Sequence, residues 1–257
     1  MYHIRHIFYI VSGEGLQVNY YVDIHANILP GLSGICSRPL TEEEAAERTN
    51  AQKEGNIKLA VAAPVYQPEV CTPAEFMVRR DAAIAKLSAH AQPMRIVPGA
   101  VLPYAYAQAH PKEIVGFAIG GCSYFLLDLP EEPPTEEFCE ALKKLRIISG
   151  YCPIAVDIDR YFDLWSPENW IALRQSEILM QISVNGLLQT ESRKLSLYLL
   201  ANSYAHFIAT GSRSIEEPLR FTEAMRMVQR SLPAQIYRRV KNNAGMLLSN
   251  AEPSSFQ

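Results

Sequence analysis

Three polar side chains alternate at the end of the first strongly apolar segment of the chain. Asp23, His25 and Asn27 stand two residues apart in this segment. Alternate side chains of a strand lie on the same face, so this spacing predicts that a carboxylate, an imidazole and an amide converge. Burying them together is costly unless they bind a ligand or hydrogen-bond one another. The segment is therefore either a binding site or a polar cluster that is satisfied within the turn after the strand.

The rest of the chain predicts the scaffold that positions this segment. Short β-branched or aromatic runs alternate with stretches of 3.6-residue apolar spacing, a pattern typical of βαβ units with a parallel sheet. The predicted strands are Tyr20–His25, Ile57–Ala62, Arg95–Val97, Ser123–Leu127, Ile154–Val156, Ile178–Ser183 and His206–Ala209. The predicted helices are Thr41–Glu54, Pro73–Ala91, Tyr104–Ile114, Thr135–Ser149, Pro167–Gln175, Ser192–Ser203 and Glu216–Arg230. Thr41 and Thr135, each followed by glutamates, have the pattern of helix N-caps.

This alternation predicts an α/β fold, a closed or nearly closed barrel of parallel strands, with an open doubly wound sheet as the alternative. Site residues of a parallel barrel lie at the carboxyl ends of the strands, where the segment from Asp23 to Asn27 falls. We predict one barrel domain over residues 20–250, an N-terminal extension over residues 1–19, and a frayed polar tail over residues 251–257.

Composition and charge argue against several classes of protein. The chain has 257 residues and a net charge of -3, without a block of Lys or Arg, which argues against nucleic acid as a partner. No apolar run has the length of a signal-peptide core or a membrane span. The five cysteines form no Cys-x-x-Cys pair, which is typical of free thiols in a reducing compartment. We therefore predict a cytoplasmic protein without membrane insertion.

Several common catalytic motifs are missing from the sequence. There is no phosphate-binding loop of the G-x-x-x-x-G-K-[ST] type. Gly13 and Gly15 lack the third glycine of a dinucleotide-binding turn. No cysteine has an arginine at the spacing that a cysteine-dependent phosphatase needs, and the run Gly31–Gly34 does not have the spacing of a nucleophile elbow.

Four segments carry a resemblance to a known family. Asp23–Ile28 is similar to an opening D-x-H-x-H motif, and Tyr124–Pro130 to a strand that ends in Glu. Pro153–Tyr161 is similar to Pro-x-Ile-Ala-His-x-Glu-Arg-Tyr, and Ala205–Arg213 to Val-His-Phe-Ile-Ala-Ser-Asp-Ala-His. Over most of its length the chain thus resembles the bacterial capsule-associated, manganese-dependent protein-tyrosine phosphatases of the PHP (polymerase and histidinol phosphatase) superfamily. The resemblance implies a PHP-type distorted (β/α)7 TIM-like barrel with parallel strands.

The resemblance also implies a cluster of metal ions, but only one of the ligand positions, His25, keeps the expected residue. The replaced positions are Asn27, Val65, Val101, Asp128, Asp157, Gly211 and Arg213. Valine and glycine offer no side-chain donor, so adjacent divalent cations should not assemble there. The remaining candidate ligands, His25, Asn27, Asp128 and Asp157, imply either no metal or a single weakly bound Mn²⁺ or Mg²⁺.

By the same resemblance Arg160 and Arg213 lie near a phosphate. Two guanidinium groups can bind an oxyanion in a bidentate manner, and Tyr66 and Tyr161 are candidates to line such a pocket. The other interpretation is that the arginines pair with neighbouring aspartates in a structural network.

Together these features imply a divergent tyrosine-phosphatase-like protein that is inactive or much impaired and binds a phosphorylated or anionic ligand linked to capsule or exopolysaccharide regulation. The implied partner is a tyrosine-phosphorylated protein tail or a tyrosine kinase of polysaccharide export. One alternative is an active metal-dependent phosphoesterase with a reduced, one-metal site. Another is a scaffold for the kinase machinery.

Overall fold

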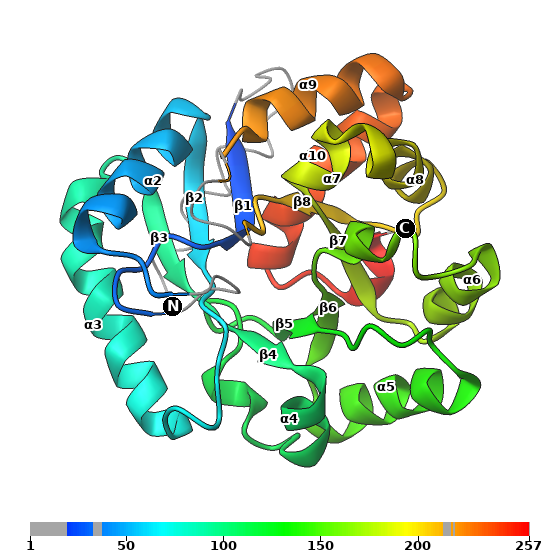
Figure 1. Cartoon of the computed structure of the whole chain (residues 1–257), viewed down its shortest axis with the longest axis horizontal. Helices are drawn as coiled ribbons and strands as arrows, with labels where there is room; N and C mark the ends of the chain where they lie inside the picture. The colour runs from blue at the N-terminus through cyan, green and yellow to red at the C-terminus, as the bar shows by residue number, and fades with distance from the viewer. Residues whose placement is uncertain (1–19, 33–37, 213–216, 218, 257) are drawn as a thin grey trace.

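Parallel strands surround the centre of the molecule, and helices cover them from outside (Figure 1). The computed structural model describes residues 20–32, 38–212, 217 and 219–256. The strands are β1 (Tyr21–Ala26), β2 (Ile57–Ala62), β3 (Arg95–Pro98), β4 (Val101–Pro103), β5 (Tyr124–Asp128), β6 (Cys152–Ala155), β7 (Leu179–Ser183) and β8 (Phe207–Ala209). The α-helices are α2 (Glu42–Glu54), α3 (Pro73–Ala91), α4 (Tyr104–Ala109), α5 (Glu136–Ser149), α6 (Pro167–Gln175), α7 (Val184–Leu188), α8 (Thr190–Ala201), α9 (Phe221–Ser231) and α10 (Ala234–Leu248). Short 3-10 helices span Ile114–Gly116, Ile158–Tyr161 and Pro253–Phe256.

The strands form a barrel with two interruptions. One parallel sheet contains β1, β2 and β3, and a second contains β4 to β8 in sequence order. A bridge between Val65 and Val101 links the two sheets on one side. On the other side the backbone N–H of Gly211 donates to the carbonyl of His25 at 3.0 Å. The strand order has no reversal of the kind found in a doubly wound sheet, so the prediction of a distorted barrel of parallel strands is confirmed.

Threonine caps begin the long helices on the outside of the barrel. The Thr41 hydroxyl accepts from the backbone N–H of Glu44, whose carboxylate accepts from the backbone N–H of Thr41, a complete capping box. Thr135 likewise accepts from the backbone N–H of Phe138. Both predicted caps are confirmed. Such caps satisfy backbone donors that have no partner within the helix.

Buried apolar side chains form two layers. Ile24, Val61, Leu126 and Phe207 belong to a cluster that draws residues from all eight strands and therefore fills the barrel interior. A second and larger cluster lies between the strands and the helices around them. Alternation along the strands produces this division, because successive side chains of a strand point to opposite faces.

Helix α10 packs against the barrel where the strands begin. Ala244 and Leu247 join the interior cluster. The Asn243 side-chain amide donates to the carbonyl of His206, just before β8, at 2.9 Å. The Cys122 thiol, just before β5, lies 3.6 Å from the carbonyl of Leu248. The amino ends of the strands are thus covered, which leaves the carboxyl ends for a site.

Three elements differ from the sequence prediction. Strand β4 was not predicted, because its three residues end in proline and only Gly99 and Ala100 separate it from β3. Helix α7 has only five residues, too few to show a helical period. Helix α10 was missed although its buried positions do follow helical spacing, with Tyr237, Val240 and Ala244 on one face.

The prediction of a frayed tail is wrong for the described residues 251–256. Phe256 is only 1% exposed and packs against the rings of Tyr124 and Phe207. The Tyr124 hydroxyl donates to the carbonyl of Ala251, and the backbone N–H of Ser123 donates to the Asn250 side chain at 2.7 Å. Five of the last six described residues are small or polar, so local composition did not reveal that one aromatic ring anchors the segment.

The cysteines agree with the prediction of free thiols as far as the structure describes them. Cys71, Cys122, Cys139 and Cys152 are unpaired, and Cys36 lies outside the described residues. Burial raises the pKa of Cys152 to about 11, which keeps this thiol protonated. Among the helices that the structure describes, none is long and apolar enough to cross a membrane.

The buried ring of Phe256 leads to a stability prediction. Replacing it by alanine should lower the free energy of unfolding by about 3–5 kcal/mol, because a large cavity would remain beside Tyr124 and Phe207. Urea denaturation followed by circular dichroism would measure this. Ser255→Ala, at the neighbouring exposed position, is the matched control and should change stability by less than about 0.5 kcal/mol. Equal stability of the two variants would show that the segment does not pack as described.

His206 leads to a prediction on pH. Burial, reinforced by Arg239 and Arg174, lowers the pKa of His206 to about 4, while its Nδ1 accepts from the backbone N–H of Met180 at 3.1 Å. An unfolded histidine titrates near pH 6.5, so between these values only the unfolded chain binds the proton. Stability from this residue is therefore lost as the pH falls, by about 2 kcal/mol between pH 7 and pH 5.

The test compares the wild type with His206→Gln in urea at these two pH values. The variant should lose about 2 kcal/mol less on acidification than the wild type does. His110→Gln, which removes an exposed histidine, is the control and should keep the wild-type pH dependence. An unchanged pH dependence in His206→Gln would contradict the prediction.

Candidate functional site

Asp23 is the centre of one polar group at the junction of β1 and β8. Its carboxylate, fully buried, accepts from the backbone N–H of His25 at 3.1 Å and from the Gln52 side chain on α2 at 2.7 Å. Thr210, which follows β8, donates its backbone N–H at 3.1 Å and its hydroxyl at 2.5 Å. Four donors of the protein itself thus surround this one carboxylate.

His25 belongs to a second polar group that faces β6 and β7. Its Nδ1 lies 3.2 Å from Oε1 of Gln181 and 3.6 Å from a carboxylate oxygen of Asp157. Gln181 Oε1 also accepts from the backbone N–H of Asp157, and its amide donates to Asp157 Oδ1 at 3.1 Å. Because that Oε1 is an acceptor, Nδ1 of His25 carries the proton.

Charge and burial act in opposite directions on this imidazole. Burial disfavours the charged ring, but the carboxylate of Asp157 and the bond to Gln181 outweigh it and raise the pKa of His25 above its ordinary value. Strict alternation predicted that Asp23, His25 and Asn27 share one face. The β1–β2 pairing shifts register between Asp23 and Ala26, and the side chains of Asp23 and His25 find different partners.

Asp159 forms a third buried pair next to Asp157. Its two oxygens accept from the backbone N–H and the hydroxyl of Ser183 at 2.6 and 2.7 Å. Burial, and then the charge of Asp157, raise the pKa of Asp159 to about 7. The carboxylates of Asp157 and Asp159 therefore stay close together partly because one of them can hold a proton near neutral pH.

Two glycines make room for these carboxylates. A Cβ on Gly211 would lie 2.0 Å from Asp157 Oδ1, and one on Gly186 would lie 2.3 Å from the Asp159 carboxyl carbon. Gly211 also has a φ of +48°, which side-chain-bearing residues rarely adopt. Position 211 therefore cannot take the metal-binding aspartate of the family pattern without displacing Asp157.

Arg160 is held by its neighbours. Its guanidinium donates to a carboxylate oxygen of Asp128 at 2.7 Å and also to the carbonyl of Leu129 and the hydroxyl of Tyr161. The pairing interpretation, an arginine in a structural network, describes Arg160 better than a free anion-binding group does. The same ion pair engages Asp128, one of the four candidate metal ligands.

The other predicted site residues lie apart from one another. Tyr66 is 1% exposed, packs against Phe76 and Phe117, and donates its hydroxyl to the carbonyl of Cys71 at 3.0 Å. Tyr161 is fully buried and stacks on Trp165 at 3.9 Å between ring centroids. Neither ring offers surface to a ligand.

Asn27 and Arg213 are the remaining predicted site residues. The Asn27 side-chain amide donates to the carbonyl of Ser212 at 3.5 Å. The backbone carbonyl of Asn27 accepts from Nε of Arg48 at 2.8 Å. Arg213 lies outside the described residues.

The donor set does not fit a cluster of metal ions. Val101 is fully buried in the interior cluster and Val65 packs against it, so two predicted ligand positions present only methyl groups. Gly211 presents none, and position 213 carries a cation. Among the described residues, no group of three His, Cys, Asp or Glu side chains comes together as a metal site. A metal cluster therefore finds neither the number nor the kind of donors that it needs.

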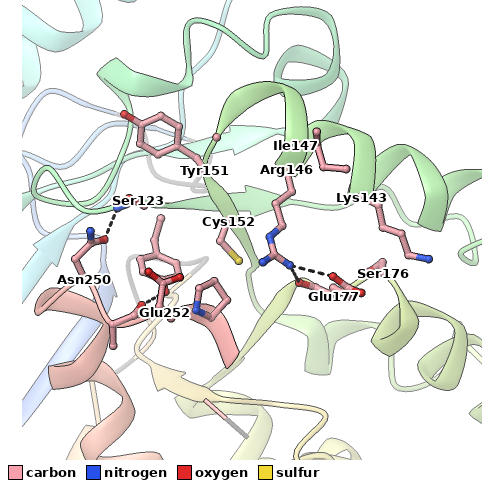
Figure 2. Close-up of a pocket in the computed structure, with 14 residues that line it drawn as sticks. Ser123, Lys143, Arg146, Ile147, Tyr151, Cys152, Ser176, Glu177, Asn250 and Glu252 are labelled. Atoms are coloured by element: carbon pink, nitrogen blue, oxygen red, sulfur yellow. Dashed lines mark hydrogen bonds and ion pairs between the residues drawn. The ribbon is translucent and has the colours of Figure 1, made fainter. Parts of the chain in front are cut away.

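A cavity of about 640 Å³ lies at the opposite end of the barrel, where β5 and β6 begin. Figure 2 shows Arg146, from α5, turned toward Glu177, and Asn250 turned toward Ser123. Arg146 donates to the Glu177 carbonyl at 3.1 Å and faces its carboxylate at 3.3 Å. Arg146 and Asn250 thus already have partners within the protein. We therefore interpret the cavity as a space between the barrel and the C-terminal segment.

Sequence reasoning missed the residues that satisfy the buried aspartates. These are Gln52, Gln181, Ser183 and Thr210, which come from α2, β7 and the end of β8. Gln181 alone left a signal, since an amide within the apolar strand Leu179–Ser183 needs a buried partner. The other three have side chains that are ordinary at their positions.

Comparisons with known proteins agree with the fold. The family model described as "Capsular polysaccharide synthesis, CpsB/CapC" matches residues 21–249. A solved chain superposes with a TM-score of 0.77 and 19% identity, covering 90% of this chain and 95% of that one. It comes from crystal structures of YwqE from Bacillus subtilis and CpsB from Streptococcus pneumoniae, described as unique metal-dependent tyrosine phosphatases. A comparison with curated proteins finds no match.

The contact between Gly211 and Asp157 leads to a prediction. Gly211→Ala should lower the free energy of unfolding through both the left-handed backbone and the collision with the carboxylate. Gly150→Ala is the matched control, because Gly150 has a φ of +74° and open space around its Cβ position. We expect Gly211→Ala to cost at least about 1 kcal/mol more than Gly150→Ala in urea denaturation. Equal losses would show that Asp157 moves aside freely.

Proposed function

Because the chain belongs to the CpsB/CapC family of capsular polysaccharide synthesis proteins, we propose that it keeps the fold of the family without an effective phosphatase reaction. In this proposal it binds a phosphorylated or otherwise anionic ligand linked to capsule or exopolysaccharide regulation. The solved relatives are tyrosine phosphatases, so the natural partner is a tyrosine-phosphorylated protein segment. A tyrosine kinase of polysaccharide export is a protein of this kind.

The observation that carries the proposal is the hydrogen-bond network that the protein's own donors form at the carboxyl ends of the strands. Of the ligand positions that keep a carboxylate, Asp157 accepts from the side-chain amide of Gln181 and Asp128 accepts from the guanidinium of Arg160. A metal-dependent phosphatase needs carboxylates that are free to face its ions. Here the protein's own donors engage these carboxylates.

The apolar replacements support the same conclusion. Val65 and Val101 pair across the junction of the two sheets and pack with the interior cluster. Restoring a histidine or glutamate there would place a polar group against methyl groups, which is costly. The valines thus contribute to packing, and that packing does not suit metal ligands.

Ligand binding would have to depend on groups other than the predicted tyrosines. Tyr66 and Tyr161 are buried, and Arg160 is engaged by Asp128. Arg213 is the remaining cation among the predicted anion-binding residues, and we propose it as the one that meets an anion. In the sequence it follows Gly211, the residue that packs against Asp157, by two positions.

The proposal predicts the outcome of two measurements on one sample. Protein purified without chelator should contain well under one equivalent of Mn, Fe or Zn by mass spectrometry and should hydrolyse an aryl phosphate no faster than buffer does. CpsB from Streptococcus pneumoniae, purified in parallel, is the positive control for metal and activity. Two or more equivalents of metal with hydrolysis would overturn the proposal.

A result of one equivalent with slow hydrolysis would favour the alternative of a one-metal phosphoesterase. A variant would then identify the ligands, because His25→Ala should remove the metal while Lys112→Ala, at an exposed position, should not. Loss of hydrolysis in both variants would indicate a contaminating phosphatase.

A further inference from the structure

Helices α9 and α10 carry a concentration of positive charge that the rest of the chain does not share. Between Phe221 and Asn250 there are five cationic residues and one acidic residue, in a chain whose net charge is -3. The cationic residues are Arg226, Arg230, Arg238, Arg239 and Lys241. Figure 1 shows the two helices as neighbours on the outside of the barrel beside β1 and β8.

Three of these arginines are exposed and have no acidic partner in the part of the chain that the structure describes. The side chains of Arg226, Arg230 and Arg238 take part in no ion pair or hydrogen bond there. Other exposed arginines do find acids, as in the pairs Arg38–Glu44 at 2.5 Å and Arg220–Glu223 at 3.4 Å. The side chains of these three arginines are thus available to an external anion.

The positive charges of the two helices face a common region. The ammonium nitrogen of Lys241 lies 5.5 Å from the ring centroid of Tyr21, at the start of β1. Arg226 is close enough to Tyr21 to act on it electrostatically. The Tyr21 hydroxyl lies 3.4 Å from that of Tyr237 on α10. Arg230 is one turn beyond Arg226, and Arg238 is three residues before Lys241, so each continues its neighbour's side of the helix.

We propose that Arg226, Arg230 and Arg238 form a docking surface for an acidic peptide segment of a partner protein. Guanidinium groups bind carboxylates and phosphates through paired N–H donors, and all three exposed cations are arginines. This surface lies on the outer helices α9 and α10, and none of its three arginines belongs to the polar network at the strand ends. The inference goes beyond the proposed function and does not depend on whether the chain hydrolyses phosphate.

The composition of the surface favours a peptide over a membrane. Stable attachment of a helix to a lipid surface combines charge with buried apolar side chains. Within α9 and α10, both described in full, no large apolar side chain is exposed. Their apolar residues, such as Phe221, Met225 and Val240, pack inward. Charge alone therefore defines this surface, which suits a flexible chain that can bring its acids to separate arginines.

The test uses the full chain and a fluorescein-labelled peptide of alternating glutamate and glycine. Fluorescence anisotropy at low ionic strength should show binding that weakens as salt is added. A peptide of alternating glutamine and glycine should not bind. The triple variant Arg226→Glu, Arg230→Glu, Arg238→Glu should bind the glutamate peptide at least about tenfold more weakly than the wild type.

A second triple variant controls for net charge. Lys86→Glu, Lys112→Glu and Lys144→Glu reverse three exposed cations elsewhere, and this protein should keep binding within about threefold of the wild type. Circular dichroism would verify that both variants are folded, and the single variant Arg230→Glu would replace the first triple variant if that one failed to fold.

Several results would overturn the proposal. Equal losses in the two triple variants would show that only overall charge matters, and absence of peptide binding at low ionic strength would remove the docking surface. Binding to phosphatidylglycerol-containing vesicles but not to the peptide would indicate a membrane surface instead. A dimer in sedimentation that dissociates in the first triple variant, without peptide binding by the wild type, would show that a second copy of the chain occupies this face.

Discussion

Buried carboxylates at one end of a parallel barrel are the constraint on which the rest of this structure depends. Asp23, Asp157 and Asp159 are almost fully enclosed, and a buried negative charge without compensation is strongly destabilising. Proteins can satisfy such charges with bound cations or with their own donors. In this chain amides, hydroxyls and backbone N–H groups from β1, β7, β8 and α2 supply the compensation.

The residues around these aspartates are compatible with their hydrogen bonds. Gly186 and Gly211 are glycines where a Cβ would collide with Asp159 and Asp157. Ser183 both satisfies Asp159 and begins α7 by accepting from the backbone N–H of Gly186 at 2.9 Å. Val65 and Val101 pair at the junction of the two sheets and pack with the interior cluster. The barrel thus combines a polar network around the aspartates with apolar packing at the junction of its sheets.

The two ends of the barrel and its outer helices differ in their packing and charge. Its strand-start end is covered by α10 and by the segment that ends in Phe256, so stability depends on that end. Its other end holds the network of the family site. On the outer helices α9 and α10, the side chains of Arg226, Arg230 and Arg238 have no acidic partner among the described residues. Under the proposed docking, contact with a partner depends on this surface charge and not on the chemistry of the site.

The sequence by itself determined the fold class, the family and the order of all strands and helices except β4, α7 and α10, because these depend on local periodicity, helix caps and motifs that stand in order along the chain. It also determined that a metal cluster lacks donors, since valine and glycine have none wherever they fold. Only the tertiary structure decided which residues satisfy the buried aspartates. Gln52 and Thr210 meet Asp23 from positions 29 and 187 residues away, and no local pattern records such contacts. The same holds for Phe256, whose burial depends on Tyr124 and Phe207, and for Arg160, whose charge is engaged by an aspartate at the end of another strand.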